Sequence, residues 1–208
     1  MGKPLTIEVV SDVVCPWCYI GKRRLEKALA LLGDEAQVSV HYLPFQLNPD
    51  MPQGGMPRAE YRKAKFGSLE RGRQLDARVA AEGQGEGIEF AFERMARTPN
   101  TLAAHRLIEL AQRQGFGQAV VEGLFHAYFE AAEDVGDPSV LEEIAQRSGV
   151  SGWPQDADAK EVAALEEQMR GLGISAVPTF IFGRKLGVSG AHPPAALAQA
   201  MREALSAK

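Results

Sequence analysis

The spacing of apolar and polar positions predicts strands near both ends of the chain. Runs rich in β-branched and aromatic residues predict buried strands at 5–14, 38–45, 176–182 and 185–189. Between the first two runs, Leu25, Leu29 and Leu32 form the apolar stripe of a helix that ends at Gly33, and Lys22 marks its solvated side. This strand–helix–strand order implies a right-handed crossover and a parallel strand pair.

From residue 49 to about residue 173 the periodicity is helical. Helices are expected at 57–66, 69–82, about 101–114, 118–131, 138–148 and about 162–172, and a last one at 194–207 closes the chain. Ser68 and Asp137 are expected N-caps, and Gly149 is an expected helix stop. We therefore expect one domain made of residues 1–48 and 174–208, and a helical insertion subdomain at 49–173.

The composition and net charge indicate which classes of binding partner to expect. With 45% hydrophobic and 24% charged residues, the chain has the composition of a soluble globular protein. The net charge of −4 gives no electrostatic reason to expect nucleic acid or an anionic membrane as a partner. The first residues lack a basic region followed by an apolar core, and strand-like sequence begins at Leu5, so we expect a cytoplasmic protein.

The only two cysteines stand in the motif Cys15-Pro16-Trp17-Cys18, where the first predicted strand gives way to a helix. Cysteines three apart at a helix start are one turn apart, within the roughly 4.4–6.8 Å Cα separation that a disulfide bridges. The unpaired N–H groups of the first turn stabilise a thiolate at Cys15, whereas Cys18 is better shielded. Pro16 suits the first helical position, and Trp17 supplies no charge to the thiolate.

Two other interpretations of the cysteine pair are a structural disulfide and half of a zinc site. A zinc site needs about four ligands. The four histidines, at positions 41, 105, 126 and 192, are not spaced as a ligand pair. A paired motif of this kind in a reducing compartment favours redox chemistry.

A second unusual feature is Val177-Pro178 at the entry of a late apolar strand. Proline cannot donate a hydrogen bond to a sheet, so its position here indicates a special backbone geometry. We expect a cis peptide bond between Val177 and Pro178.

Together these two features resemble the thioredoxin superfamily, in which a CxxC follows the first strand and an apolar-Pro-Thr-apolar run enters a late one. Helices inserted between the two halves resemble its DsbA branch. The stretches SDVVCPWCYIGKRRLEKAL and GISAVPTFIFGRKLGVSGAHPP look most like FrnE-like oxidoreductases. The resemblance implies an α/β, thioredoxin-like fold, with a mixed central sheet flanked by helices and a large all-helical insertion.

The resemblance also implies roles for the motif residues. Cys15 would be the attacking thiolate and Cys18 the resolving thiol. Pro16 and Trp17 would tune the thiolate and shape the contact surface. Classical DsbA has a histidine where Trp17 stands, so a less oxidising centre is expected.

The resemblance also implies roles for residues outside the CxxC motif. Val177 and cis Pro178 would flank the sulfurs and bind an extended substrate segment. Thioredoxin-like folds tend to keep a buried carboxylate as a proton acceptor, and Glu8 and Asp12 are the candidates on the leading strand. The alternative for both carboxylates is a purely structural role.

The expected function is a thiol–disulfide oxidoreductase, with disulfide isomerase activity as a variant. It would act on protein or small-molecule thiols and disulfides, with a separate redox partner for recycling. No cofactor beyond the redox-active pair is expected, and glutathione is a candidate co-substrate. One alternative is a glutathione-dependent isomerase or transferase, of the 2-hydroxychromene-2-carboxylate isomerase or kappa-class transferase type, although those relatives typically carry serine where Cys15 stands. Another is a non-catalytic binding module.

Overall fold

The computed structural model describes residues 2–207 and divides into two compact units. The first unit contains the chain up to Phe45 and from Ala163 onward, and the second contains Gln46–Val162. The second unit therefore ends within a helix, whereas the periodicity of the sequence extends the insertion to residue 173.

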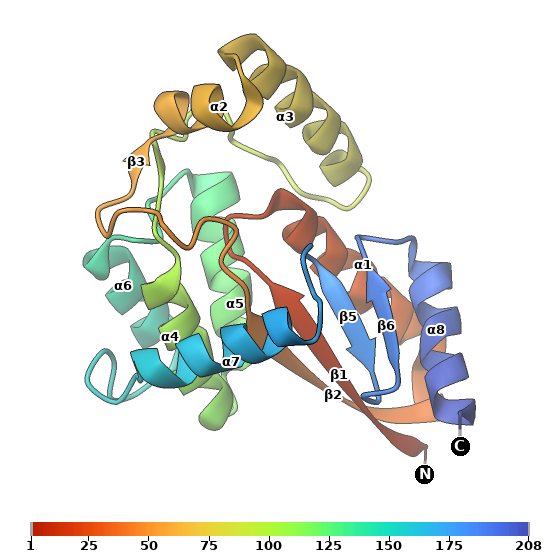
Figure 1. Ribbon diagram of the computed structural model, residues 1–208. Helices are drawn as coiled ribbons and strands as arrows, with labels where there is room; N and C mark the ends of the chain where they lie inside the picture. The colour runs from red at the N-terminus through yellow and green to blue at the C-terminus, as the bar shows by residue number, and fades with distance from the viewer. Residues whose placement is uncertain (1, 208) are drawn as a thin grey trace. The chain divides into compact units, whose positions relative to one another are not determined.

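The first unit is built on a four-stranded mixed sheet (Figure 1). Its elements are β1 (Lys3–Ser11), α1 (Pro16–Leu32), a 3-10 turn (Gly33–Glu35), β2 (Ala36–Pro44), β5 (Thr179–Phe182), β6 (Leu186–Ser189) and α8 (Pro194–Ser206). The strand order is β2-β1-β5-β6, in which β1 and β2 are parallel and the other pairs antiparallel. The expected α/β fold with a mixed sheet and flanking helices is confirmed. The expected first strand ends early, at Ser11, and residues 12–14 form the turn that leads into α1.

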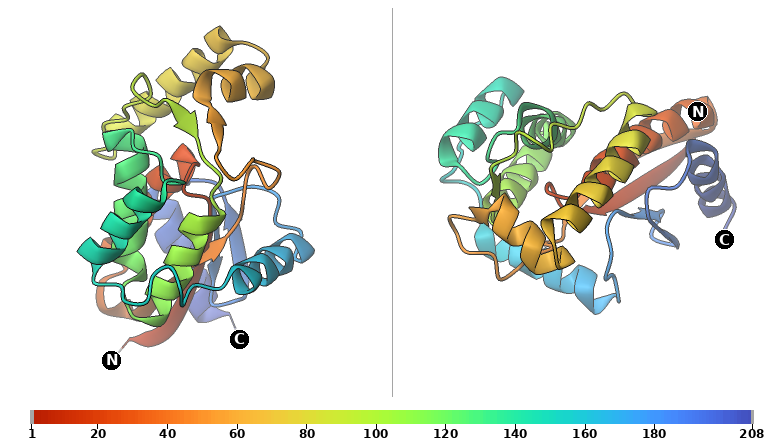
Figure 2. Two further views of the ribbon diagram at one scale, coloured as in Figure 1. Left: turned by 90° about the vertical axis from the view of Figure 1, so that its left-hand side faces the viewer. Right: turned by 90° about the horizontal axis from the view of Figure 1, so that it is seen from above.

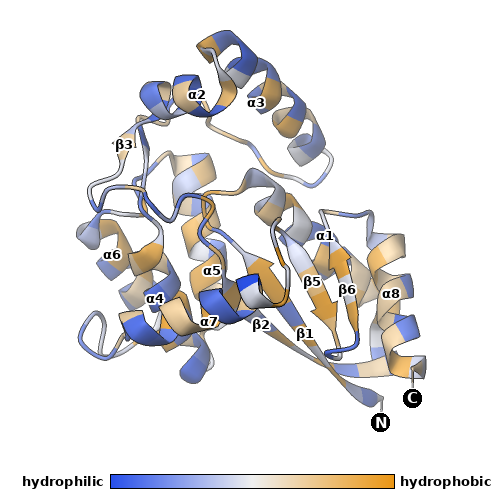
Figure 3. Ribbon diagram, in the orientation of Figure 1, coloured by the Kyte–Doolittle hydropathy of each residue, from blue (hydrophilic) through white to orange (hydrophobic). Residues whose placement is uncertain are grey.

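The core of the first unit contains the strand that was predicted to be buried. In β1 the side chains of Leu5, Ile7 and Val9 are buried, and α1 and α8 pack against each other beside the sheet (Figure 1). The strands β5 and β6 are coloured mainly as hydrophobic in Figure 3. One expectation was wrong: Lys22 is only 4% exposed, and its ammonium group forms an ion pair with Glu26 one turn further along α1. A lysine stem can pack against apolar neighbours when a partner is available for its charge, so α1 buries a wider face than its leucine spacing predicts.

The second unit is mainly helical. Its elements are β3 (Met56–Pro57), α2 (Arg58–Phe66), α3 (Leu69–Gln84), β4 (Arg97–Thr98), α4 (Leu102–Arg113), α5 (Gly117–His126), a π-helical turn (Ala127–Ala131), α6 (Pro138–Ser148) and the start of α7 (Ala159–Gly171). The helices α4, α5 and α6 pack on one another (Figure 2). Ser68 and Asp137 cap α3 and α6 as predicted, and Gly149 ends α6. The short antiparallel pair β3–β4 is an addition to the expected all-helical subdomain.

The helix expected at 118–131 changes its winding near the end. After α5, residues 127–131 form a π-helical turn, and the following Ala132 is left-handed, with φ 62°. The carbonyl of Phe129 accepts a hydrogen bond from the Ala91 N–H at 2.7 Å. This bond from outside the helix is consistent with a locally wider turn, which apolar periodicity does not reveal.

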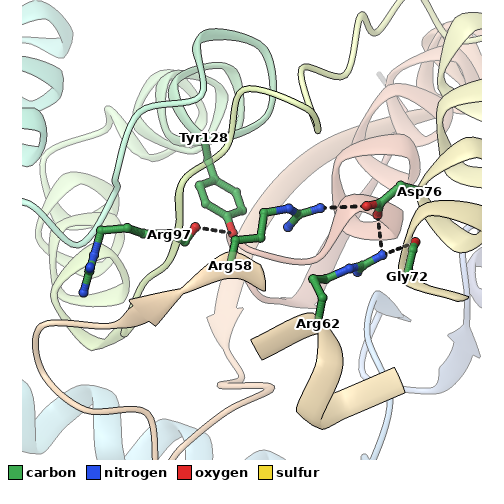
Figure 4. Close-up of polar contacts among 6 residues, drawn as sticks. All are labelled: Arg58, Arg62, Gly72, Asp76, Arg97 and Tyr128. Atoms are coloured by element: carbon green, nitrogen blue, oxygen red, sulfur yellow. Dashed lines mark hydrogen bonds and ion pairs between the residues drawn. The ribbon is translucent and has the colours of Figure 1, made fainter. Parts of the chain in front are cut away.

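The hairpin of α2 and α3 is held by polar contacts, since α2 has no buried residue (Figures 3 and 4). Arg58 and Arg62 of α2 converge on the Asp76 carboxylate of α3, at 3.0 and 2.7 Å, and Arg62 also donates to the Gly72 carbonyl. Burial raises the pKa of Asp76 more than the two guanidinium groups lower it. The ion pairs are thus partly dehydrated, which offsets part of their Coulombic attraction.

Candidate active site

The turn after β1 places the two cysteines at the start of α1. The Asp12 carbonyl accepts a hydrogen bond from the Cys15 N–H, and the Cys15 carbonyl accepts one from the Cys18 N–H, both at 3.0 Å. Cys15 is the N-cap of α1, with extended backbone (φ −92°, ψ 111°), and Pro16 occupies the first turn. Both cysteines are free thiols, 5% and 3% exposed. The expected arrangement of Cys15 at the helix start and Cys18 one turn inside is confirmed.

The Val177–Pro178 segment lies next to Cys15. Its peptide bond is cis, as expected. In the antiparallel register Val10 of β1 lies opposite Thr179 of β5, so the residues that follow Val10 approach the residues that precede Thr179. The Cys15 Sγ lies 3.7 Å from the Val177 carbonyl oxygen, within hydrogen-bonding distance for a sulfur donor. The sheet register therefore brings together two segments 162 residues apart in the sequence.

Hydrogen bonds fix the loop on both sides of Val177. The Thr179 hydroxyl donates to the Ala176 carbonyl at 2.8 Å, and the Gly190 N–H donates to the Pro178 carbonyl at 2.7 Å. The Val177 carbonyl is thereby held toward Cys15.

Gly21 allows α1 to approach this loop closely. A Cβ at Gly21 would lie 3.0 Å from Pro178 Cγ and 3.1 Å from Phe180 Cζ, tighter than nine in ten real contacts. Both neighbours are buried rings, and the Phe180 ring is fully enclosed, so neither can move aside easily.

We expect Gly21→Ala to lower the free energy of unfolding by about 1–2 kcal/mol, because overpacking exceeds the gain in helix propensity. Urea denaturation measures the change. Gly171→Ala is the matched control, since a Cβ at Gly171 meets nothing within 4 Å. Equal free energies of unfolding for Gly21→Ala and Gly171→Ala would show that the close packing of α1 on Pro178 does not limit the stability of the protein.

The buried environment of Cys18 disfavours its thiolate form. Burial is the main cause that raises the pKa of Cys18 well above its usual value, and the hydrogen bond to Cys15 and the charge of Cys15 add to it. A hydrogen bond from the Ser11 side chain and one from the Asp12 backbone act in the opposite direction. Ser11 was not among the predicted site residues. Its only sequence signal is that it is a polar residue at the end of an apolar strand, directly before the turn that carries the cysteines.

The two candidate carboxylates have different surroundings. Asp12 is fully buried, and its backbone contacts both Cys15 and Cys18. Glu8 forms an ion pair at 3.1 Å with Arg184, an exposed residue in the β5–β6 turn. The structure thus brings Asp12 to the cysteines and gives Glu8 a different partner.

The remaining motif residues line the surface next to the thiols. Trp17 is 39% exposed, so its indole is accessible beside the buried cysteines, and Pro16 is partly buried. Within residues 2–207, no three His, Cys, Asp or Glu side chains gather as a metal-binding group. In the same part of the chain, no helix is long and apolar enough to span a membrane.

Comparison with known proteins gives one family. Residues 6–202 match the model of the family described as DSBA-like thioredoxin domain. The crystal structure of a probable DsbA oxidoreductase from Streptomyces coelicolor has 31% sequence identity and a TM-score of 0.88, covering 98% of this chain and 91% of that one. The Bacillus subtilis protein YwbO is 28% identical over 85% of this chain and 86% of its own length. A 2-hydroxychromene-2-carboxylate isomerase has 15% identity and a TM-score of 0.71, covering 95% of each chain, which shows a shared fold.

Proposed function

We propose, from the premise that this chain belongs to the family of DSBA-like thioredoxin domains, that Cys15 and Cys18 are its centre of dithiol–disulfide exchange. The observation that carries the proposal is the contact between the Cys15 Sγ and the Val177 carbonyl, beside cis Pro178 and at the N-terminus of α1. A helix N-terminus stabilises a thiolate, and the adjacent backbone offers a place for an extended substrate.

The proposed exchange has two steps. The Cys15 thiolate attacks a sulfur of a substrate disulfide, which forms a mixed disulfide and releases the first substrate thiolate. Cys18 then attacks Cys15, closes the Cys15–Cys18 disulfide and releases the second substrate thiolate, so that the substrate is reduced by two electrons. The reverse sequence oxidises a dithiol substrate.

Neighbouring groups have supporting roles in this proposal. The Val177 backbone and the exposed Trp17 would bind an extended segment of a protein or a small-molecule disulfide. Asp12, rather than Glu8, would accept the Cys18 proton, because Asp12 is fully buried and its backbone contacts both cysteines. Trp17 in place of histidine supports a less oxidising centre than classical DsbA. FrnE-like membership and isomerase activity are parts of the same proposal and follow from the motif resemblance. A cytoplasmic location and a separate recycling partner are proposed with them.

Redox titration tests the proposal. The protein is equilibrated in graded glutathione buffers, alkylated, and mapped by mass spectrometry. We expect one two-electron transition that links Cys15 to Cys18, with a potential between the values near −270 mV of thioredoxin and near −120 mV of DsbA. Thiols that stay alkylatable in the most oxidising buffer would contradict the proposal and favour a binding module. Glutathione-dependent turnover that needs no Cys18 would favour the isomerase or transferase alternative.

A further inference from the structure

The connecting segment that joins β6 to α8, residues 190–193, forms hydrogen bonds on two sides (Figure 1). On one side, the Gly190 N–H donates to the Pro178 carbonyl at 2.7 Å, so the segment supports the cis-proline loop. On the other side, the Ala191 carbonyl accepts a hydrogen bond from the Arg24 guanidinium group of α1 at 2.6 Å. The connecting segment therefore links the cis-proline loop to the helix that carries the two cysteines.

The connecting segment has a fixed backbone conformation of its own. Gly190 has a φ of +99°, a conformation that glycine adopts at no steric cost. The His192 N–H donates to the Gly190 carbonyl at 3.0 Å, and His192 Nε2 lies 2.9 Å from the Ser189 carbonyl oxygen. Because these bonds hold the segment together, a shift of Ala191 would be passed on to Gly190 and to the carbonyl that it supports.

Arg24 lies on the face of α1 that meets the cis-proline loop. Gly21 and Arg24 are three residues apart and therefore neighbours on one face of the helix. The helix approaches Pro178 at Gly21 and holds the connecting segment at Arg24. The contacts form a closed ring that runs from Cys15 along α1 to Arg24, then through Ala191, Gly190, Pro178 and Val177 back to the Cys15 Sγ.

We propose that Arg24 is a positioning residue of the exchange reaction: its guanidinium group holds the connecting segment, and thereby fixes the Val177 backbone on which an extended disulfide substrate pairs. This role rests on the proposed function and deepens it, because it favours substrates that have a peptide backbone. Arg24 acts through the backbone of Gly190 and Pro178, whereas the Cys15 thiolate is stabilised by the start of α1. The residue thus affects how a peptide binds and leaves the reactivity of the thiolate unchanged.

Arg24→Met tests this role, because methionine keeps an unbranched side chain for packing but has no donor for the Ala191 carbonyl. Two substrates are compared, a short peptide with an internal disulfide and Ellman's reagent, a small aromatic disulfide without a peptide backbone. Dithiothreitol recycles the protein, and the uncatalysed rate is subtracted. We expect the KM for the peptide to rise about tenfold and kcat to stay within about twofold, as loss of one charge-assisted hydrogen bond in substrate binding implies. The rate with Ellman's reagent and the reduction potential should keep their wild-type values.

Amide hydrogen exchange gives a second measurement that does not depend on catalysis. The Gly190 N–H, which is bonded to Pro178, should exchange about tenfold faster in Arg24→Met, because the connecting segment opens more often. The Gly183 N–H is the internal reference, since it donates to the Thr6 carbonyl at 2.8 Å in the turn between β5 and β6. Its exchange rate should not change.

Arg202→Met is the matched control. Arg202 also donates to a backbone carbonyl of α1, that of Leu31 at 3.0 Å, but at the opposite end of the helix. This variant should change neither the KM for the peptide nor the exchange of Gly190. Arg24→Lys keeps a charged donor and should restore the KM at least in part.

The outcomes separate the role of Arg24 from the proposed function. A wild-type KM for the peptide, or a wild-type exchange rate of Gly190, in Arg24→Met would overturn the role of Arg24, and so would equal increases in Arg202→Met. A parallel loss of the reactions with the peptide and with Ellman's reagent would make the role of Arg24 purely structural. If the wild-type protein reduced neither disulfide, the proposed function itself would fail.

Discussion

Cys15→Ser is expected to reduce the turnover of insulin disulfides to the rate of the buffer alone. A serine hydroxyl is not ionised near neutral pH, and the helix N-terminus that stabilises a thiolate does not make it a comparable nucleophile. The side chain is nearly isosteric, and Cys15 is bonded to Asp12 and Cys18 through its backbone, so the fold should remain intact. Turbidity of reduced insulin in the presence of dithiothreitol measures the loss, and circular dichroism checks the fold.

The companion variant Cys18→Ser separates attack from resolution. Cys15 can still attack a disulfide, but no second thiol follows, so a mixed disulfide should accumulate. Intact-mass spectrometry would then show the mass of one substrate thiol added at Cys15. Because the chain contains no other cysteine, a third thiol cannot resolve the intermediate. Insulin turnover that survives in Cys15→Ser, or an adduct absent from Cys18→Ser, would exclude the proposed mechanism.

Trp17→His is expected to make the cysteine pair more oxidising, by roughly 30 mV or more, which corresponds to about 1.4 kcal/mol for two electrons. Trp17 is exposed on the first turn of α1, between the two cysteines, and it has no group that can carry positive charge. A histidine there would donate a hydrogen bond or carry positive charge next to the thiolate. Preferential stabilisation of the reduced form raises the potential, as in DsbA.

The matched control is Trp17→Phe, which keeps an aromatic surface but adds no donor. Its potential should stay close to that of the wild-type protein, although binding of a peptide substrate can weaken as the surface shrinks. Both potentials are measured by glutathione titration with mass mapping. Equal potentials for Trp17→His and Trp17→Phe would mean that the residue between the cysteines does not control the oxidising strength of this centre.

The features that the sequence predicted correctly depend on neighbours within a few residues. The order of strands and helices follows from the spacing of apolar side chains, which differs between strands and helices. The caps at Ser68 and Asp137 follow from short-range hydrogen bonds. The start of α1 at Pro16 and the one-turn separation of the cysteines are likewise local. A proline at the entry of an apolar strand was a sufficient signal for the cis bond before Pro178.

Other features required contacts between residues that are distant in the sequence or share no pattern. Periodicity could not choose between Glu8 and Asp12. Their surroundings differ because Glu8 pairs with Arg184, far along the chain, and because Asp12 lies in the turn after the strand. The burial of Lys22 depends on how its long side chain packs beside Glu26. The pair of arginines on Asp76 also joins two helices whose patterns give no sign of the contact.

The sequence alone thus determined that Cys15 and Cys18 lie at the start of a helix after a buried strand, because hydrophobic spacing and helix-start chemistry are local. Only the tertiary structure decided what surrounds the two sulfurs. Val177 reaches Cys15 through the antiparallel register of β1 and β5, and the Asp12 carbonyl reaches the Cys15 N–H through the turn after β1. The packing of the whole unit decides which residues face each other in the sheet and which groups bond across the turn. The local spacing of apolar residues in the sequence does not reveal these pairs.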